Sequence, residues 1–374
     1  MPTFVRRTGR ACLVATLLAL GATAVPAASA NATEAGTHAS VSHRAQPVTA
    51  AAAGAGWIAR DLSSGGAIVD AISHKPSAGD TADAILALVA AGDGSAQVKA
   101  ATQWLEHNFS SYVAVKGVDS PGALGLVVLA AVAAGADATR FGGQKGGNDL
   151  IARLMATEQM HGPSAGVFGK TSSANAFSQS LAVLALVAAK GPTTAIGLGE
   201  AYLAGRQCTD GGWQYSLTTP CAKPDPKTYA GPDTNSTALA VMAIVGAGGQ
   251  FPHAPLGFFA SSQETDGSFG YYGVSGDGQH GDPDSTAEVV QALIALRAIN
   301  DNQLVRNAIT PERALENFQY GCGAPANERG EFAYDGAPSQ YATLQAVPAV
   351  AAEALPIAPR SLSAAEPSIS CSAG

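Results

Sequence analysis

Six alanine-rich apolar segments recur along the chain, and this recurrence constrains the fold more than any other feature. The segments span residues 80–92, 120–135, 178–191, 235–248, 284–296 and 339–352. When Ala82, Ala123, Leu181, Ala238, Ala287 and Ala342 are taken as equivalent positions, the steps are 41, 58, 57, 49 and 55 residues. Six units of about this length indicate a repeat architecture.

A second, more amphipathic segment precedes each apolar one. These partners lie near residues 57–62, 97–109, 149–160, 194–206, 256–263 and 311–318. Segments that are apolar nearly all round predict buried helices, and segments with one charged face predict helices that border water. The sequence therefore predicts an all-α fold of six helical hairpins, about twelve helices. An open solenoid needs polar end repeats, but the first and last apolar segments are as apolar as the others, which favours a closed ring.

The two ends of the chain differ from this repeat. Residues 1–30 combine a basic head with an apolar run and an Ala-Ser-Ala site, as in a secretory signal peptide. The apolar run is too short to span a membrane, so we expect a secreted, extracellular protein that is not membrane-spanning. Residues 31–54 lack periodicity and predict a disordered leader. The helical domain is expected at 55–356, followed by a Pro- and Ser-rich surface tail at 357–374.

Charge and cysteine content narrow the possible partners. Removal of three arginines with the signal peptide changes the formal charge from −8 to −11. An acidic surface without basic clusters argues against nucleic acid as a partner. Four cysteines remain, and an even number in an exported chain favours two disulfides. Cys208–Cys221 and Cys322–Cys371 are the expected pairs, although three pairings are possible.

A repeated motif follows two of the amphipathic segments. Its copies are Gln207-x₃-Gly211-x-Trp213 and Gln263-x₃-Gly267-x-Phe269, with degenerate copies that end at Phe168 and Phe332. We expect a structural role: the glycine allows a left-handed turn, the Gln amide binds backbone groups at helix ends, and the aromatic ring covers the next hairpin. The motif resembles the Gln–Trp repeat of the terpene cyclase and protein prenyltransferase superfamily. This resemblance covers roughly residues 56–355 and implies an α/α-toroid.

The resemblance also suggests a catalytic position. Class II terpene cyclases protonate their substrate with an aspartic acid of an Asp-x-Asp-Asp-Thr-Ala stretch, which the segment Asp282-Pro-Asp284-Ser-Thr-Ala resembles. By this resemblance Asp284 would be the general acid, assisted by Asp282. The competing interpretation makes Asp284 a helix N-cap, with Ser285 and Glu288 as a capping box. The positions equivalent to Asp284 in the other units support capping: Gly79, Ser120, Ser178, Asn235 and Ser339. We favour capping.

Other activities and ligands of related folds fit less well. Protein prenyltransferases bind zinc through an Asp-x-Cys pair and a later His, and this pattern is absent from the sequence, so we expect no metal site of that kind. The acidic loop 277–284 offers oxygen ligands for calcium, but without the spacing of a known calcium loop. We otherwise expect no cofactor. The chain also resembles the exported vitamin B12 carriers in its helical barrel, and this resemblance supports a binding role.

The loops at one end of the ring carry the remaining candidate residues. We expect Tyr215, Phe269, Tyr271, Tyr272, Tyr334 and Asp233 to form a ligand-binding surface there. The first interpretation is thus an exported toroid that binds an apolar small molecule or a cell-envelope component without full catalytic equipment. A small class II terpene cyclase and a structural envelope protein remain alternatives.

Overall fold

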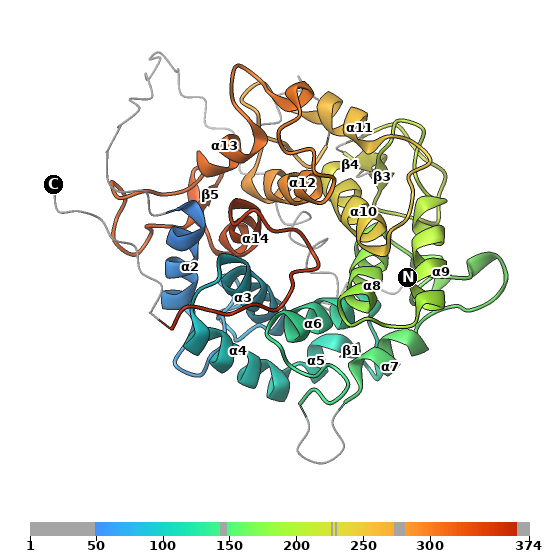
Figure 1. Cartoon of the computed structure of the whole chain (residues 1–374), viewed down its shortest axis with the longest axis horizontal. Helices are drawn as coiled ribbons and strands as arrows, with labels where there is room; N and C mark the ends of the chain where they lie inside the picture. Colours follow the sequence, from blue (N-terminus) through green and yellow to red (C-terminus); the bar gives the residue numbers. More distant parts are fainter. Residues whose placement is uncertain (1–48, 143–147, 226, 229, 273–280, 365–374) are drawn as a thin grey trace, which may run out of the picture.

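A flat ring of helices forms the whole of the described structure. A computed structural model describes residues 49–142, 148–225, 227–228, 230–272 and 281–364. Viewed along its short axis, the molecule has an inner ring of helices surrounded by an outer one (Figure 1). The predicted signal peptide and most of the predicted leader lie outside the described residues.

The inner ring consists of the six alanine-rich helices. They are α3 (Ala78–Ala91), α6 (Pro121–Ala133), α8 (Ala176–Ala188), α10 (Thr234–Ala247), α12 (Pro283–Ala295) and α14 (Gln340–Val350). Each packs against its two neighbours, and the last, α14, packs against the first, α3. The predicted closed ring is therefore confirmed.

The outer ring consists of the six amphipathic partners. They are α2 (Ala50–Asp61), α4 (Ser95–Asn108), α7 (Leu150–Ala156), α9 (Thr193–Ala204), α11 (Pro255–Ser262) and α13 (Pro311–Glu316). All twelve predicted helices are present, and a four-residue helix, α5 (Ser110–Val113), follows α4. None of the helices in the described part of the chain is both long enough and apolar enough to cross a membrane.

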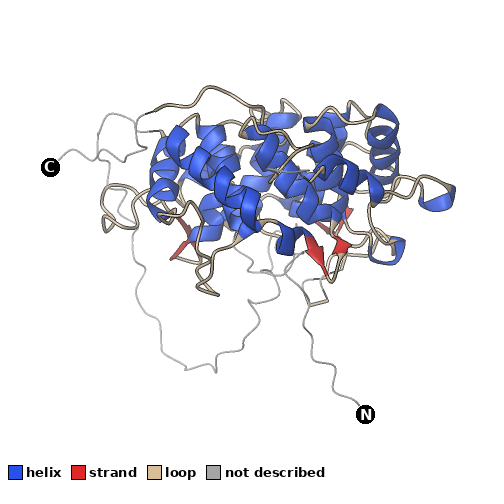
Figure 2. Ribbon diagram, turned by 90° about the horizontal axis from the view of Figure 1, so that it is seen from below, coloured by secondary structure: helices blue, strands red, loops and turns tan. Residues whose placement is uncertain are grey.

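Short hairpins and single turns of 3-10 helix complete the structure. Three two-stranded antiparallel sheets pair β1 (Ala114–Val115) with β2 (Val118–Asp119), β3 (Trp213–Gln214) with β4 (Pro232–Asp233), and β5 (Phe332–Tyr334) with β6 (Ala337–Ser339). The 3-10 turns are η3 (Gly162–Ser164), η4 (Thr171–Ser173) and η5 (Asn302–Leu304). The strands lie along one edge of the disc (Figure 2). This is the edge at which inner helices begin, since β4 and β6 run directly into α10 and α14.

The Gln–Trp motif joins neighbouring hairpins, as its chemistry predicted. Gln207 donates to the backbone oxygens of Gly211 at 2.9 Å and His253 at 2.7 Å, and His253 directly precedes α11. Trp213 is fully buried, and its Nε1 donates to Leu203 O on α9 at 2.8 Å. The Gln207 amide thus joins the end of one outer helix to the start of the next, and the Trp213 indole packs beneath α9.

The same device closes the ring. Gln319 Nε2 donates to Gly330 O at 3.0 Å and to Ala50 O at 2.8 Å, at the start of α2. Trp57 Nε1 donates to Asn327 O at 3.1 Å across the same junction. The partners of these seam contacts lie 269 and 270 residues apart in the chain.

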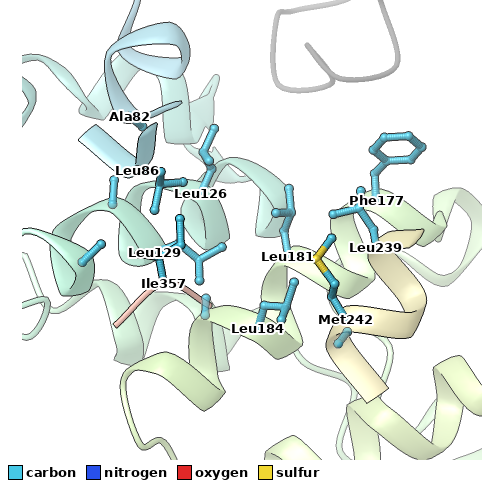
Figure 3. Packing of buried hydrophobic residues seen from close by; sticks show 14 of the residues in the cluster. Ala82, Leu86, Leu126, Leu129, Phe177, Leu181, Leu184, Leu239, Met242 and Ile357 are labelled. Carbon is cyan, nitrogen blue, oxygen red and sulfur yellow. The ribbon is translucent and has the colours of Figure 1, made fainter. Parts of the chain in front are cut away.

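The packed structure extends past both predicted domain boundaries. Helix α2 begins at Ala50, so residues 50–54 are helical although a disordered leader was predicted there. At the other end, residues 351–364 form a segment that we call the C-terminal strap. Its Ser363 pairs with the backbone of Gly92 and Ser95, beside the C-terminal end of α3. Ile357 is 1% exposed and packs into the central apolar cluster, so the tail predicted at 357–374 begins with a buried residue, whereas most of the described residues after it are exposed (Figure 3).

The third unit carries a variant of the motif. Glu158 pairs with Phe168 through the backbone bridge that Gln263 makes with Phe269 and Gln319 makes with Phe332. A carboxylate therefore occupies the position of the motif glutamine. Both of its oxygens are buried without a hydrogen-bond partner among the described residues, and burial raises the pKa of Glu158 to about 7.

We predict that Glu158→Gln stabilises the protein at neutral and alkaline pH. A carboxyl whose pKa is raised in the folded state stabilises that state only while protonated, so its contribution is lost as the pH rises through about 7. Gln cannot ionise, so the variant avoids the cost of a buried charge, and its amide adds a donor beside Gly166 O, which already accepts from Gln179. At about pH 8 the free energy of unfolding, measured with denaturant, should rise by about 1–2 kcal/mol. Glu106→Gln, on the outer helix α4, is the control and should change nothing; an unaltered pH dependence in Glu158→Gln would contradict the assignment.

Candidate functional site

The six inner helices begin with side-chain caps that set a common register. The N-cap residues are Ser77, Ser120, Asn175, Asp233, Asp282 and Ser339. Each accepts a hydrogen bond from the backbone N–H three residues later, which fixes where its helix starts. Positions counted from these caps therefore lie at comparable depth along the axis of the ring.

The sixth residue after each cap forms a layer around the axis. On α6, α8 and α10 this residue is leucine: Leu126, Leu181 and Leu239. On the other three helices it is polar. These residues are Asp83 on α3, Glu288 on α12 and Gln345 on α14. One half of the layer is thus hydrocarbon and the other half carries carboxyl and amide groups.

This layer lines a cavity of about 50 Å³ on the axis of the ring. All six of its residues contribute to the wall, together with Leu86, Gln291, Leu344, Pro348 and Leu355. Figure 3 shows the leucine side, where Leu126, Leu181 and Leu239 come from three neighbouring helices. Leu355 belongs to the C-terminal strap, so the strap forms part of the wall on the side of the helix C-terminal ends. The volume suits a small head group or a few waters.

Three polar atoms on one face of α12 lack hydrogen-bond partners among the described residues. They are Asp284 Oδ1, Glu288 Oε2 and Gln291 Oε1. Glu288 is 6% exposed and Gln291 4%, and both side chains line the cavity. Buried polar groups in proteins are nearly always paired, so these three unpaired oxygens set this face of α12 apart from the rest of the inner ring.

Burial dominates the electrostatics of this polar half. It raises the pKa of Glu288 to about 8. It raises the pKa of Asp284 well above its ordinary value, and the charges of Asp282 and Glu288 raise it further. The pKa of Asp83 is raised well above its ordinary value by burial and by the charges of Asp80 and Glu288. Like charges in a poorly solvated space favour the protonated acids.

The helix cap that we assigned to Asp284 is Asp282 instead. Asp282 is the N-cap of α12: its Oδ1 accepts from Ser285 N at 2.7 Å and its Oδ2 from Ser285 Oγ at 2.9 Å. Asp284 is the second residue after this cap and belongs to the unpaired set, so the interpretation of Asp284 as a cap is wrong. The capping box of Ser285 and Glu288 is also wrong, because Ser285 lies inside the helix.

The other supposed caps were misplaced in the same way. Ser120 and Ser339 are caps, as predicted. Gly79, Ser178 and Asn235 lie two or three residues inside their helices, after the true caps Ser77, Asn175 and Asp233.

Four of the predicted ligand-binding residues gather near the start of α10. Asp233 is buried and accepts a hydrogen bond from the Tyr271 hydroxyl, and burial raises the pKa of Asp233 to about 7. The rings of Tyr271 and Tyr272 lie 4.8 Å apart, and the Tyr215 ring lies 5.7 Å from that of Phe177 on α8. Tyr215 and Tyr271 are close enough to affect each other electrostatically. These side chains border the edge at which the inner helices begin.

The remaining two predicted binding residues lie elsewhere. Phe269 is fully buried against Phe259 of α11, so it serves the Gln–Trp motif and is not available to a ligand. Tyr334 is 43% exposed on β5, which lies beside α14. Tyr334 therefore lies apart from the aromatic residues near the start of α10.

Most of the polar residues in and beside the cavity were not predicted from the sequence. Asp83, Gln291, Tyr341 and Gln345 were not singled out, although each is a polar residue within an alanine-rich helix. Tyr341 faces the same acids, since Asp284, Asp83 and Glu288 all act on it electrostatically, and its hydroxyl accepts from Gln345 at 2.7 Å. Counting from the N-caps would have brought Asp83, Glu288 and Gln345 to one level.

The expectations for metals and disulfides have mixed outcomes. Cys208–Cys221 is confirmed. Cys322 is also disulfide-bonded, but Cys371 lies outside the described residues, so that pairing stays a prediction. In the part of the chain that the structure describes, no three His, Cys, Asp or Glu side chains are grouped to hold a metal ion. Residues 277–280, the first half of the acidic loop considered for calcium, lie outside that part, and calcium there stays a prediction.

Comparison with solved structures identifies the fold. Neither a protein-family profile nor a curated protein sequence matches the chain. The type II terpene cyclase MstE from Scytonema superposes with a TM-score of 0.54 at 12% identity, over 81% of this chain and 96% of that one. A structure described as a novel alpha-amylase from Clostridium perfringens gives the same TM-score and identity, over 81% and 98%. The chain thus has an α/α-toroid fold, which it shares with the type II terpene cyclase MstE.

Proposed function

We propose that the protein is an exported toroid that binds a small molecule in its axial cavity, through the mouth at which the inner helices begin. The two-sided lining of the cavity supports this proposal most directly. Three leucines offer a surface for hydrocarbon, and unpaired carboxyl and amide oxygens face them across the axis. Because the cavity is small, the body of the ligand would lie toward the mouth, where Phe177 and Tyr215 form an aromatic pair.

The predicted signal peptide and the disulfide support the exported part of the proposal. The Cys208–Cys221 bond requires an oxidising environment, such as the outside of the cell. An N-terminal Asn31 on protein recovered from the medium is the check.

Acid catalysis is a second candidate, favoured by the state of Asp284. Its carboxyl does not cap the helix, and burial raises its pKa, which favours the protonated form that a general acid requires. Protonation of an alkene also requires neighbours that stabilise the carboxylate left behind. The two charged groups that act on Asp284, Asp282 and Glu288, are themselves acids, so this arrangement favours binding over catalysis.

Titration with geraniol, a short unsaturated alcohol, tests the binding proposal. We expect saturable binding of about one geraniol per chain by calorimetry. Leu181→Trp fills the leucine side of the cavity and should weaken binding at least tenfold, which corresponds to about 1.4 kcal/mol. Leu198→Trp, the same exchange on the outer helix α9, is the matched control and should bind as the parent does. Equal affinity in both variants would refute a cavity site.

The same incubations test catalysis. Under the binding proposal, geraniol is recovered unchanged after incubation with the parent chain. If gas chromatography detects cyclic products that are lost in Asp284→Asn, the protein is a cyclase and the binding proposal is wrong.

A further inference from the structure

The polar half of the cavity carries unpaired acceptor oxygens and has no positively charged side chain. Asp284, Glu288 and Gln291 follow one another at spacings of four and three residues, so they lie on one face of α12. Each has an oxygen without a partner among the described residues. A ligand that satisfies this row must bring hydrogen-bond donors.

Charge leads to the same conclusion. None of the residues that line the cavity is a lysine, arginine or histidine. Glu288 on α12 and Asp83 on α3 face each other across it closely enough for the charge of Glu288 to raise the pKa of Asp83. The described residues thus leave two cavity carboxyls without a basic partner.

We propose that the ligand of the axial cavity carries a protonated amine, which binds between Glu288 and Asp83 while its hydrocarbon part packs against Leu126, Leu181 and Leu239. The proposal rests on the binding function proposed above and specifies the class of ligand. A primary ammonium has three donors, which can satisfy Glu288, Gln291 and Asp83, all of which line the cavity. A cavity of about 50 Å³ accommodates such a head group.

Other head groups satisfy the site less well. A carboxylate or a diphosphate would add negative charge beside Asp83 and Glu288, and no basic side chain lines the cavity to offset it. A hydroxyl has one donor and would leave the other acceptors unpaired. A bare metal ion would need at least three suitably grouped ligands, and no such group occurs among the described residues.

Binding of a cation should release a proton. Six ionisable groups bear on the site: Asp80 and Asp83 from α3, Asp282, Asp284 and Glu288 from the cap and first turns of α12, and Tyr341 from α14. The pKa of Glu288 is about 8 in the free protein, so this carboxyl is mainly protonated at pH 7. An ammonium beside it favours the carboxylate and lowers its pKa. Affinity for the amine should therefore increase as the pH rises from about 6 to about 9, while affinity for the alcohol stays constant.

Three compounds with the same hydrocarbon part test the proposal: geranylammonium, geraniol and geranate. We expect the purified chain to bind geranylammonium at least tenfold more tightly than geraniol, and geranate at least tenfold more weakly. Calorimetry in two buffers of different ionisation enthalpy should show release of up to about one proton with the amine alone.

Variants distinguish a specific site from general attraction to an acidic protein. Glu288→Gln keeps the shape of the side chain and should remove most of the preference for the amine while geraniol binding persists. Glu106→Gln removes one charge from the outer surface and should leave the preference intact. If geraniol binds and geranylammonium binds no better, the amine assignment fails and the binding function stands. If none of the three compounds binds, both fail.

Discussion

Trp213→Ala should lower the free energy of unfolding by about 4 kcal/mol, among the largest losses that a single side chain can cause here. Truncation of a fully buried aromatic residue costs about 3–5 kcal/mol, because burial energy is lost and a void remains. The backbone oxygen of Leu203 also loses its donor, Trp213 Nε1. Denaturant unfolding monitored by circular dichroism measures the change.

Two further exchanges show whether the effect belongs to the motif. Trp213→Phe should cost less than half as much, because the fifth unit places Phe269 at the same point. Tyr334→Ala, at an exposed aromatic residue, should change stability by less than about 0.5 kcal/mol. A loss below about 1 kcal/mol for Trp213→Ala would mean that the ring does not support its hairpin.

Gly166→Ala should have an effect of similar size for a different reason. Gly166 has φ +87°, a left-handed conformation that L side chains rarely adopt, and an added Cβ would overlap the backbone oxygen of Leu198. The neighbouring outer helix would have to move. We expect a loss of at least about 3 kcal/mol, as the sum of backbone strain and overpacking.

A nearby glycine provides the matched control. Gly162 has φ +75°, but its added Cβ would meet nothing within 4 Å. Gly162→Ala should therefore cost only the backbone strain, about 1–2 kcal/mol. The difference between the two midpoints of thermal unfolding measures the contribution of the close approach between Gly166 and Leu198 O. Equal losses in the two variants would show that this approach does not matter for stability.

The periodicity of the sequence predicted the helices well because it reports burial directly. All twelve helices form where the apolar and amphipathic segments placed them, and the Gln–Trp motif binds the backbone as its amide chemistry implied. Ring closure could also be predicted, since neither end of the repeat offers a polar face to water.

The register of the helix starts was harder to predict. Equivalent alanines locate a helix to within a few residues, whereas a cap depends on one residue outside the apolar pattern. Pro283 was the neglected signal: proline favours the first position of a helix, which makes Asp282 the cap and leaves Asp284 free. With that register, Asp284 is no longer a helix cap but a buried carboxyl with an unpaired oxygen, one turn before the cavity residue Glu288.

The packing of the C-terminal strap could not be predicted from the sequence, for another reason. Ile357 is a single buried residue in a segment otherwise rich in proline and serine. One apolar side chain creates no period, so its place among the inner helices follows only from the shape of the assembled ring.

The seam between the first and last hairpins has a consequence for biosynthesis. Gln319 and Asn327 bind backbone and side-chain groups of α2 that left the ribosome some 270 residues earlier. A nascent chain therefore remains an unfinished arc, with the apolar flank of α3 waiting for α14, until almost its whole length has been synthesised. The ring therefore cannot close before α14 has been synthesised, and its closure depends on the first and last hairpins meeting.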